Sequence, residues 1–265
     1  MISATTISPL NRRILDEDGF DPSTSAIIAQ MTANGSTPTE VRQAIINQLV
    51  LDLKGLGNTG SDDVWSRLDI LNIHAAEDAI QSQTQWINAD GTYDSVQVGT
   101  PTFTADVGFS STNVANRIDP IWNAATGLGN YTQNNASVLF YGIVTNLNYV
   151  LSSADYRINF RAGLSNVDNG LNNPGFPLAS WGVVGDNLYV LDRIVSTEFK
   201  GYVNTSLAFT ISATSSTPTA GQVRYPYSNA SSVYTQTAKI VAFGASIRDV
   251  LPQLKASFDA YLAAL

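Results

Sequence analysis

Hydrolysis of a glycosidic bond is a reaction that two well-placed carboxyl groups can perform, so the acidic residues of this chain come first. The two groups must lie about 5 to 10 Å apart, and one of them must stay protonated. The chain has only four glutamates, Glu17, Glu40, Glu77 and Glu198. No strand-like segment carries alternating acids that would put two carboxylates on one face. Glu77 and Asp78 are adjacent, so on a strand they would point to opposite faces. We therefore expect no enzyme and assign no catalytic residue.

Metal ligands are scarce as well. The chain has one histidine, His74, and no cysteine, whereas zinc sites and catalytic triads need several such side chains together. Residues 16–21 gather carboxylates around Gly19, as calcium loops do, but the later bidentate glutamate of a complete loop is missing. We predict no metal site and no cofactor, and we interpret this segment as a solvated turn. A calcium ion held in a loop stays an open alternative.

Aromatic rings in loops rich in asparagine and glycine form the candidate binding surface. Such rings stack on sugars, and neighbouring amides hydrogen-bond to sugar hydroxyls. The two segments that combine these features are Ile121-Trp122-Asn123 and Tyr225-Pro226-Tyr227-Ser228-Asn229. We predict that a bound saccharide would contact Trp122, Asn123, Tyr225, Tyr227 and Asn229. The competing interpretation is that these rings are buried in the core, as most of the other aromatic residues should be.

Composition narrows the classes of function. Charged residues make up 14% of the chain, the net charge is -8, and no basic run occurs. The electrostatic footprint of a nucleic-acid-binding protein is therefore missing, and we exclude DNA and RNA as partners. The apolar fraction of 44% is enough for a core without disulfides. The sequence shows neither a basic segment followed by an apolar stretch at its start nor a long apolar run, so we expect no secretion signal and no membrane span.

Helical patterns occur near both ends of the chain. Residues 1–35 have no sustained period, which indicates an arm with one short apolar helical stretch at 26–31. A helix over residues 38–53 follows, with Thr37 as its cap, Pro38 at its first position and Glu40 completing a capping box. The last twenty residues repeat apolar side chains at helical spacing, and Ser246 and Asp249 offer capping groups. We predict an amphipathic helix that packs at the C-terminus.

The middle of the chain alternates with period two and is divided by turns rich in Gly, Asn and Pro. Its strand candidates are residues 68–73, 95–98, 102–105, 137–144, 155–162, 181–184, 187–191, 202–211 and 238–243. Many short strands with almost no helix between them favour a sandwich or barrel over alternating strand and helix units. The predicted fold class is mostly β.

Several short blocks carry a resemblance to a known group of proteins. They are VWSRLDIL (64–71), AAEDA (75–79), WIN (86–88), PTFTAD (101–106) with GF (108–109), RIDP (117–120), NYTQNNAS (130–137) and FGAS (243–246). The pattern, spread over residues 40–265, resembles phage virion structural proteins that have a concanavalin A-like (laminin G-like) jelly-roll domain. The chain departs from the group at Val107, where a basic residue is usual, and at 110–116, where glycines are fewer. This puts a turn there in doubt. The resemblance implies a place in a phage particle and transfers no site residues.

Together these patterns predict a concanavalin A-like jelly-roll β-sandwich over residues 60–265, closed by the C-terminal helix. Residues 1–59 would form an arm and capped helix for anchoring and assembly. We expect a bacteriophage virion structural protein, made in the host bacterial cytoplasm and displayed on the particle as a tail fibre or tip or as a head decoration. Its partners would be other virion proteins, copies of itself and a host cell-surface saccharide. A decoration or connector protein without a ligand is the alternative, and a glycan-degrading virion enzyme has less support.

Overall fold

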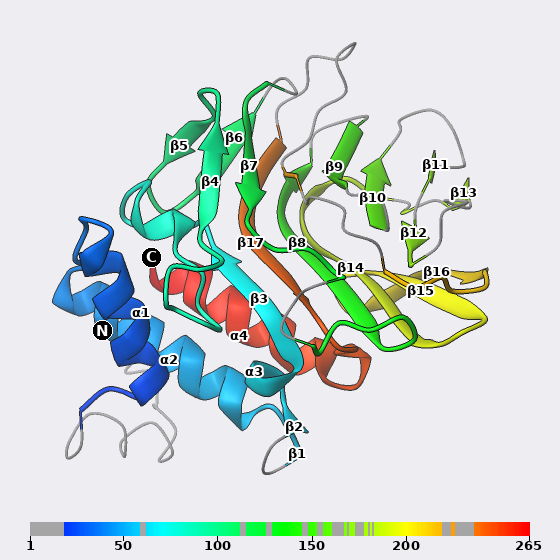
Figure 1. Cartoon of the computed structure of the whole chain (residues 1–265), viewed down its shortest axis with the longest axis horizontal. Coiled ribbons are helices and arrows are strands. Elements are labelled where there is room, and N and C mark those ends of the chain that lie inside the picture. The colour runs from blue at the N-terminus through cyan, green and yellow to red at the C-terminus, as the bar shows by residue number, and fades with distance from the viewer. Residues whose placement is uncertain are drawn as a thin grey trace, which may run out of the picture.

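The structure, a computed structural model, confirms the predicted fold class, a mostly β sandwich with helices near both ends (Figure 1). It describes residues 19–58, 62–111, 115–125, 129–144, 148–152, 156–160, 167–168, 170–172, 178–179, 181, 183–218, 224–225 and 236–265. The helices are α1 (Pro22–Ala33), α2 (Glu40–Gly55), α3 (Val64–Arg67) and α4 (Leu251–Ala264), with short 3-10 turns η2 (Gln81–Gln83) and η3 (Arg248–Val250).

One antiparallel sheet of eight strands dominates the described part of the chain, in the order β16-β15-β14-β8-β17-β6-β5. The eighth strand, β3, pairs with β17 beyond the end of β6. The strands are β3 (Leu68–Ile73), β5 (Thr102–Thr104), β6 (Gly108–Ser111), β8 (Ala136–Val144), β14 (Gly185–Val195), β15 (Glu198–Val203), β16 (Ser206–Ser212) and β17 (Gln236–Gly244).

Shorter ladders complete the β structure. β4 (Ser95–Val98) pairs with β7 (Arg117–Pro120), and β10 (Tyr156–Phe160) pairs with both β9 (Asn148–Ser152) and β12 (Gly170–Leu171). Two further pairs of two-residue strands are β1 (Gly57–Asn58) with β2 (Asp62–Asp63) and β11 (Val167–Asp168) with β13 (Leu178–Ala179). Ile118 of β7 and Leu171 of β12 belong to one hydrophobic cluster with residues of the main sheet, so these ladders form the second β layer.

The central strands are buried on both faces, which explains their continuous apolar runs. Val138 and Phe140 of β8 point into a core shared with the second β layer, where Ile118 and Trp122 belong to the same cluster. Leu139 of the same strand points into the opposite core, which the helices cover. Alternation along each strand thus divides one sheet between two hydrophobic cores.

The helices pack on one face of the sheet, with α1 and α2 at the left of Figure 1 and α3 and α4 nearer its middle. Ile27 and Met31 of α1 are 0% and 1% exposed and belong to the same core as Leu254 and Phe258 of α4. The helical stretch predicted at 26–31 is confirmed within α1, which is longer than predicted and packs into the core instead of extending as an arm. Residues 1–18 of the predicted arm lie outside the described residues. A separate anchoring unit ending at residue 59 stays a prediction.

Helix ends differ in detail from the sequence prediction. Thr39, not Thr37, caps α2, and its Oγ1 accepts the backbone N–H of Arg42 at 3.3 Å. Asp21 caps α1, and Pro22 is its first residue, where the missing N–H costs nothing. Neither Ser246 nor Asp249 caps α4, which continues directly from η3 and begins at Leu251 without a side-chain cap.

Most described strand predictions are confirmed, and two are wrong. Residues 181, 183 and 184 of the candidate 181–184 have no strand geometry, and Val183 and Val184 are exposed. The candidate 202–211 is two strands, β15 and β16, joined by a tight turn in which Asn204 has a φ of 56°. None of the helices in the described ranges has the length and apolar character of a membrane span.

Candidate functional site

Two of the predicted sugar-contacting rings are core residues. Trp122 is 2% exposed and lies between Phe243, stacked at a centroid distance of 5.0 Å, and Tyr131, at 5.6 Å. Tyr225 is 0% exposed, and its hydroxyl lies 3.1 Å from Nε2 of His74. A ring enclosed by protein on both faces cannot stack on a sugar, so the prediction for Trp122 and Tyr225 is wrong.

The other predicted contacts are not settled by burial. Asn123 is half-buried, and its Oδ1 accepts the backbone N–H of Ala125 at 3.1 Å, as in an Asx turn. Tyr227 and Asn229 lie outside the described residues. Contact of these three side chains with a saccharide stays a prediction.

His74 belongs to the core and not to a metal or catalytic site. Its Nδ1 lies 2.7 Å from the carbonyl oxygen of Ser82, which can only accept, so Nδ1 carries the proton and Nε2 accepts from the hydroxyl of Tyr225. Burial lowers the pKa of His74 to about 4, which keeps the ring neutral. Among the residues that the structure describes, no group of three or more His, Cys, Asp and Glu could hold a metal ion.

The acidic segment 16–21 is described only at its end. Asp21 accepts the backbone N–H of Ser23 at 2.8 Å and the Nζ of Lys54 at 2.6 Å. The carboxylate of Asp21 therefore caps the N-terminus of α1 and links α1 to Lys54 of α2, which is a structural role. Asp16, Glu17 and Asp18 lie outside the described residues, so the calcium alternative is untested there.

A pocket opens at the end of the sheet where β8 begins and β14 and β17 end. Its volume is about 390 Å³, within the range of about 300–1,000 Å³ common for small-molecule sites. The residues that line it are Arg67, Asn135, Ile194, Ala245, Ser246, Arg248 and Asp249. They come from α3, from the residues just before β8, from the end of β14 and from the segment between β17 and α4. The neighbouring ends of β8, β14 and β17 therefore bring most of the lining together.

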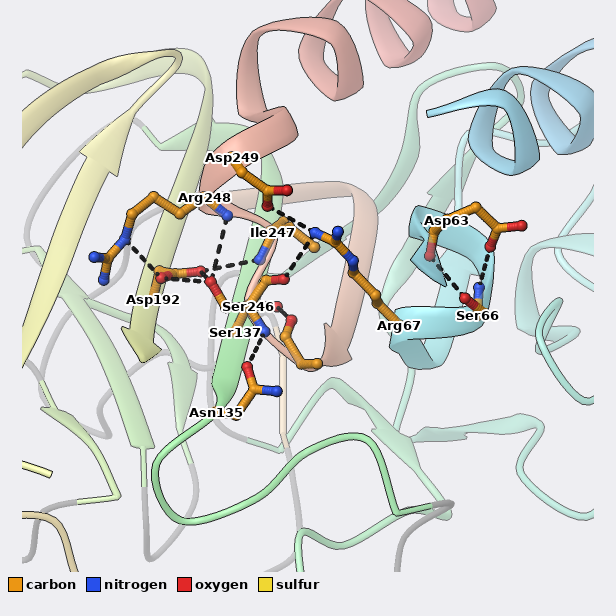
Figure 2. A network of polar contacts seen from close by, with 11 residues as sticks. Asp63, Ser66, Arg67, Asn135, Ser137, Asp192, Ser246, Ile247, Arg248 and Asp249 are labelled. Atoms are coloured by element: carbon orange, nitrogen blue, oxygen red, sulfur yellow. Dashed lines mark hydrogen bonds and ion pairs between the residues drawn. The ribbon is translucent and has the colours of Figure 1, made fainter. Parts of the chain in front are cut away.

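Asp192 of β14 organises the floor behind this pocket (Figure 2). Its carboxylate is 0% exposed and accepts the hydroxyl of Ser246 at 2.8 Å, the backbone N–H of Ile247 at 3.1 Å and Nε of Arg248 at 3.0 Å. Burial raises the pKa of Asp192, and these hydrogen bonds and the charge of Arg248 oppose that rise. The three donors are consecutive in sequence, so one carboxylate fixes the turn that leads from β17 into η3.

Arg67 forms the opposite wall. It is the last residue of α3, whose cap Asp63 accepts the backbone N–H of Ser66 at 2.7 Å. The Nη1 of Arg67 lies 2.6 Å from Oδ1 of Asp249, and this hydrogen bond lowers the pKa of that carboxyl. Gly244 permits the close approach of β17 to α3, because a Cβ at this position would lie 2.3 Å from the carbonyl oxygen of Arg67.

The rim of the pocket combines polar groups that suit hydroxyls with an apolar wall. Oδ1 of Asn135 accepts the backbone N–H of Ser246 at 2.8 Å. The Nδ2 of Asn135 has no partner among the described residues and is open to a ligand. Asp249, 61% exposed at its side chain, presents a carboxylate acceptor, and Ile194, 50% exposed, presents an aliphatic surface. A sugar offers the complementary donors, acceptors and C–H faces.

This arrangement favours binding over acid catalysis. Asp249 is the only acidic residue among the described residues that line the pocket, and its pKa is lowered, so it stays ionised. Asp192 lies behind the lining and is engaged by three donors. Hydrolysis of a glycoside needs a second carboxyl group that keeps its proton.

Sequence reasoning missed this pocket. In the sequence, Ser246 and Asp249 resemble helix caps, and Arg67, Asn135 and Asp192 form no motif because they are far apart in the chain. A signal was nevertheless present, since the blocks 64–71, 130–137 and 243–246 each supply at least one residue of the lining. These three segments meet at one place in the fold.

Comparisons with known proteins agree with the fold. No protein-family model matches the chain, and no curated protein matches its sequence. Among solved structures, domain 4 of AbnA, a GH43 extracellular arabinanase from Geobacillus stearothermophilus in complex with arabinotriose, has a TM-score of 0.50 and 12% identity, with 71% of this chain and 98% of that domain covered. A mutant of Trypanosoma rangeli sialidase displaying trans-sialidase activity has a TM-score of 0.53 and 11% identity over 84% of this chain and 39% of that one.

A point mutant of HCR/D has a TM-score of 0.52 and 9% identity, with 72% of this chain and 53% of that chain covered. The chain therefore spans about half of the HCR/D chain and nearly all of the arabinanase domain. At these identities the likeness shows a shared β-sandwich fold and nothing about activity.

Proposed function

We propose that this chain is a saccharide-binding β-sandwich protein without catalytic activity, and that the pocket between Arg67, Asn135, Ile194 and Asp249 holds the sugar. The observation that carries the proposal is the rim itself, where an open amide donor, a carboxylate acceptor and an aliphatic side chain surround a small cavity. The arabinotriose complex of domain 4 of AbnA supports it, because that domain has a similar fold and binds a short glycan.

The pocket is built to bind without rearrangement. The turn at 246–248 is fixed by Asp192, and Asn135 and Arg67 are held by partners on that turn or beside it. Groups that are already ordered lose little conformational entropy when a ligand arrives. A preformed site of this kind suits an adhesive protein.

A glycan array tests the proposal. Asn135→Asp removes the open amide donor and keeps the Oδ1 that accepts the backbone N–H of Ser246. Asp249→Ala removes an exposed carboxylate whose ion pair with Arg67 contributes at most about 1 kcal/mol to stability. Each should weaken binding of the best array glycan about tenfold, because one or two hydrogen bonds are lost. Glu40→Gln, an exposed change at the start of α2, is the matched control for charge and should bind as the parent does. Parent-like binding by both pocket variants would refute the site.

We further propose that the protein is part of a bacteriophage particle, attached through its N-terminal segment, with host-glycan adhesion as its task. Support comes from the resemblance of the blocks 64–71, 130–137 and 243–246, and from their convergence on the pocket. An antibody against the chain should label purified phage particles in electron micrographs. Labelling confined to the host cell would contradict this assignment.

A further inference from the structure

Next to the pocket, three loop segments are joined into one polar surface, which we call the platform: residues 132–135, 194–197 and 213–217. Nε2 of Gln133 donates to the hydroxyl of Ser215 at 3.1 Å, and that hydroxyl donates to Oδ1 of Asn134 at 2.5 Å. The backbone N–H of Ser215 donates to the carbonyl of Ser196 at 2.7 Å. These hydrogen bonds link all three segments.

A buried arginine holds the platform from below. Arg193 is 0% exposed and donates to the carbonyls of Leu171, Val195 and Ala213 at 3.0 to 3.2 Å. Asn172 adds a second support, because its Nδ2 donates to the carbonyl of Thr132 at 2.9 Å and to that of Gln133 at 3.0 Å. The guanidinium donates to backbone carbonyls and lies over the ring of Phe199, 5.3 Å from its centroid, so Arg193 has a structural task here. Its effect is to hold the loops in place before any ligand binds.

The platform continues directly from the pocket. Asn134 precedes Asn135, which lines the pocket, and Ser196 and Thr197 follow Ile194, which forms its aliphatic wall. A ligand that occupies the pocket and extends past Asn135 or Ile194 would therefore pass over the platform.

The chemistry of the platform is uncharged and rich in open hydrogen-bonding groups. Residues 132–135, 194–197 and 213–217 include no Asp, Glu, Lys, Arg or His. Oδ1 of Asn134 is used, but its Nδ2 and the hydroxyls of exposed Ser196 and Thr197 have no partner among the described residues. Open amides and hydroxyls without charge match a neutral polyol and give no attraction to a carboxylate or sulfate group.

We propose that the bound saccharide is a neutral oligosaccharide of at least three residues, with one residue in the pocket and the following residues on the platform. This inference rests on the proposed function and adds the length and charge of the ligand. Each platform residue that makes a hydrogen bond to the second or third sugar increases affinity for the longer ligand alone.

A microbial glycan array with neutral and uronic-acid-containing saccharides of one to six residues tests both properties. Titration calorimetry of the full chain then compares the best-scoring trisaccharide with its terminal monosaccharide. We expect the neutral trisaccharide to bind about tenfold or more tightly than the monosaccharide. In the double variant Asn134→Ala and Thr197→Ala this ratio should fall toward one, whereas the exposed edge-strand variant Thr210→Ala should keep the parental ratio.

The outcomes separate this inference from the proposed function. Absence of any array signal would overturn the proposed function itself. Binding in which the monosaccharide equals the trisaccharide, or in which an acidic saccharide exceeds its neutral counterpart, would leave the pocket in place and overturn the platform. Thermal unfolding of each variant shows whether a lost signal comes from lost folding, and Asn134→Ala alone provides a milder change if the double variant is unstable.

Discussion

Replacing Asp192 by alanine should release the turn at 246–248 that lines the pocket and lower the free energy of unfolding of the whole protein. The carboxylate is fully buried and is the shared acceptor for Ser246, Ile247 and Arg248. Without it, a buried backbone N–H, a hydroxyl and a guanidinium lose their partner at once. Alanine adds no group that could replace any of these bonds.

The cost can be bounded from the structure. Removing one partner of a buried ion pair typically costs about 3–5 kcal/mol. Arg248 is 20% exposed at its side chain and can regain some hydration, so the lower end of that range, about 3 kcal/mol, applies here. With an m value of about 3 kcal/mol/M, the urea midpoint should fall by about 1 M at unchanged slope.

A double-mutant cycle assigns this loss to the network. Arg248→Met removes the guanidinium and keeps the aliphatic length of the side chain, and the variant Asp192→Ala with Arg248→Met should lose less than the sum of the single changes. The coupling should be about 1–3 kcal/mol, as for residues in direct contact. A loss below 1 kcal/mol for Asp192→Ala, or additive effects in the cycle, would refute the role of Asp192 as the organiser of the pocket.

Three further predictions concern the fold. His74 has a pKa lowered from 6.5 to about 4, so the folded state binds its proton less readily than the unfolded chain; stability is fully present above pH 6.5 and falls by about 3 kcal/mol as the pH drops to 4. Its ring signals in NMR should titrate near pH 4, and titration near 6.5 would contradict its burial. Gly244→Ala should lower the free energy of unfolding in urea by about 1–3 kcal/mol, because the added Cβ overpacks the contact with α3. Gly55→Ala, which has open space around it, should leave that free energy unchanged or raise it. Equal effects of the two changes would contradict this explanation. Deleting residues 1–35 removes the buried Ile27 and Met31 and should lower the free energy of unfolding by about 4 kcal/mol, measured against a chain lacking only residues 1–18; equal stability of the two truncated chains would show that α1 does not contribute.

The sequence predicted elements well where one local signal dominates. β8 is a continuous apolar run because both of its faces are buried, and α4 has an apolar stripe that must be covered. The turn at Asn204 was missed because it contains no glycine or proline, although asparagine also adopts a positive φ. The sequence pattern does not distinguish Thr37 from Thr39 as the cap of α2, because both threonines can accept a backbone N–H and they stand two residues apart.

The candidate site was harder to predict, because it depends on contacts between distant segments. Trp122 stands in a loop sequence, yet its ring fills the space between Phe243 and Tyr131, and no periodic pattern reports the direction in which a loop ring points. Asp192 and Arg193 are both buried, although they are neighbours in β14. Because they point to opposite faces of the strand, they belong to different hydrogen-bond networks. Only the meeting of α3, β8, β14 and β17 reveals the pocket.

A crystal structure of the full chain with its best array glycan would show where the sugar binds. We expect one sugar residue between Asn135, Ile194 and Asp249, with the next residues along Asn134 and Thr197. A glycan ordered elsewhere, for example against residues 225–229, with nothing in the pocket would contradict this expectation.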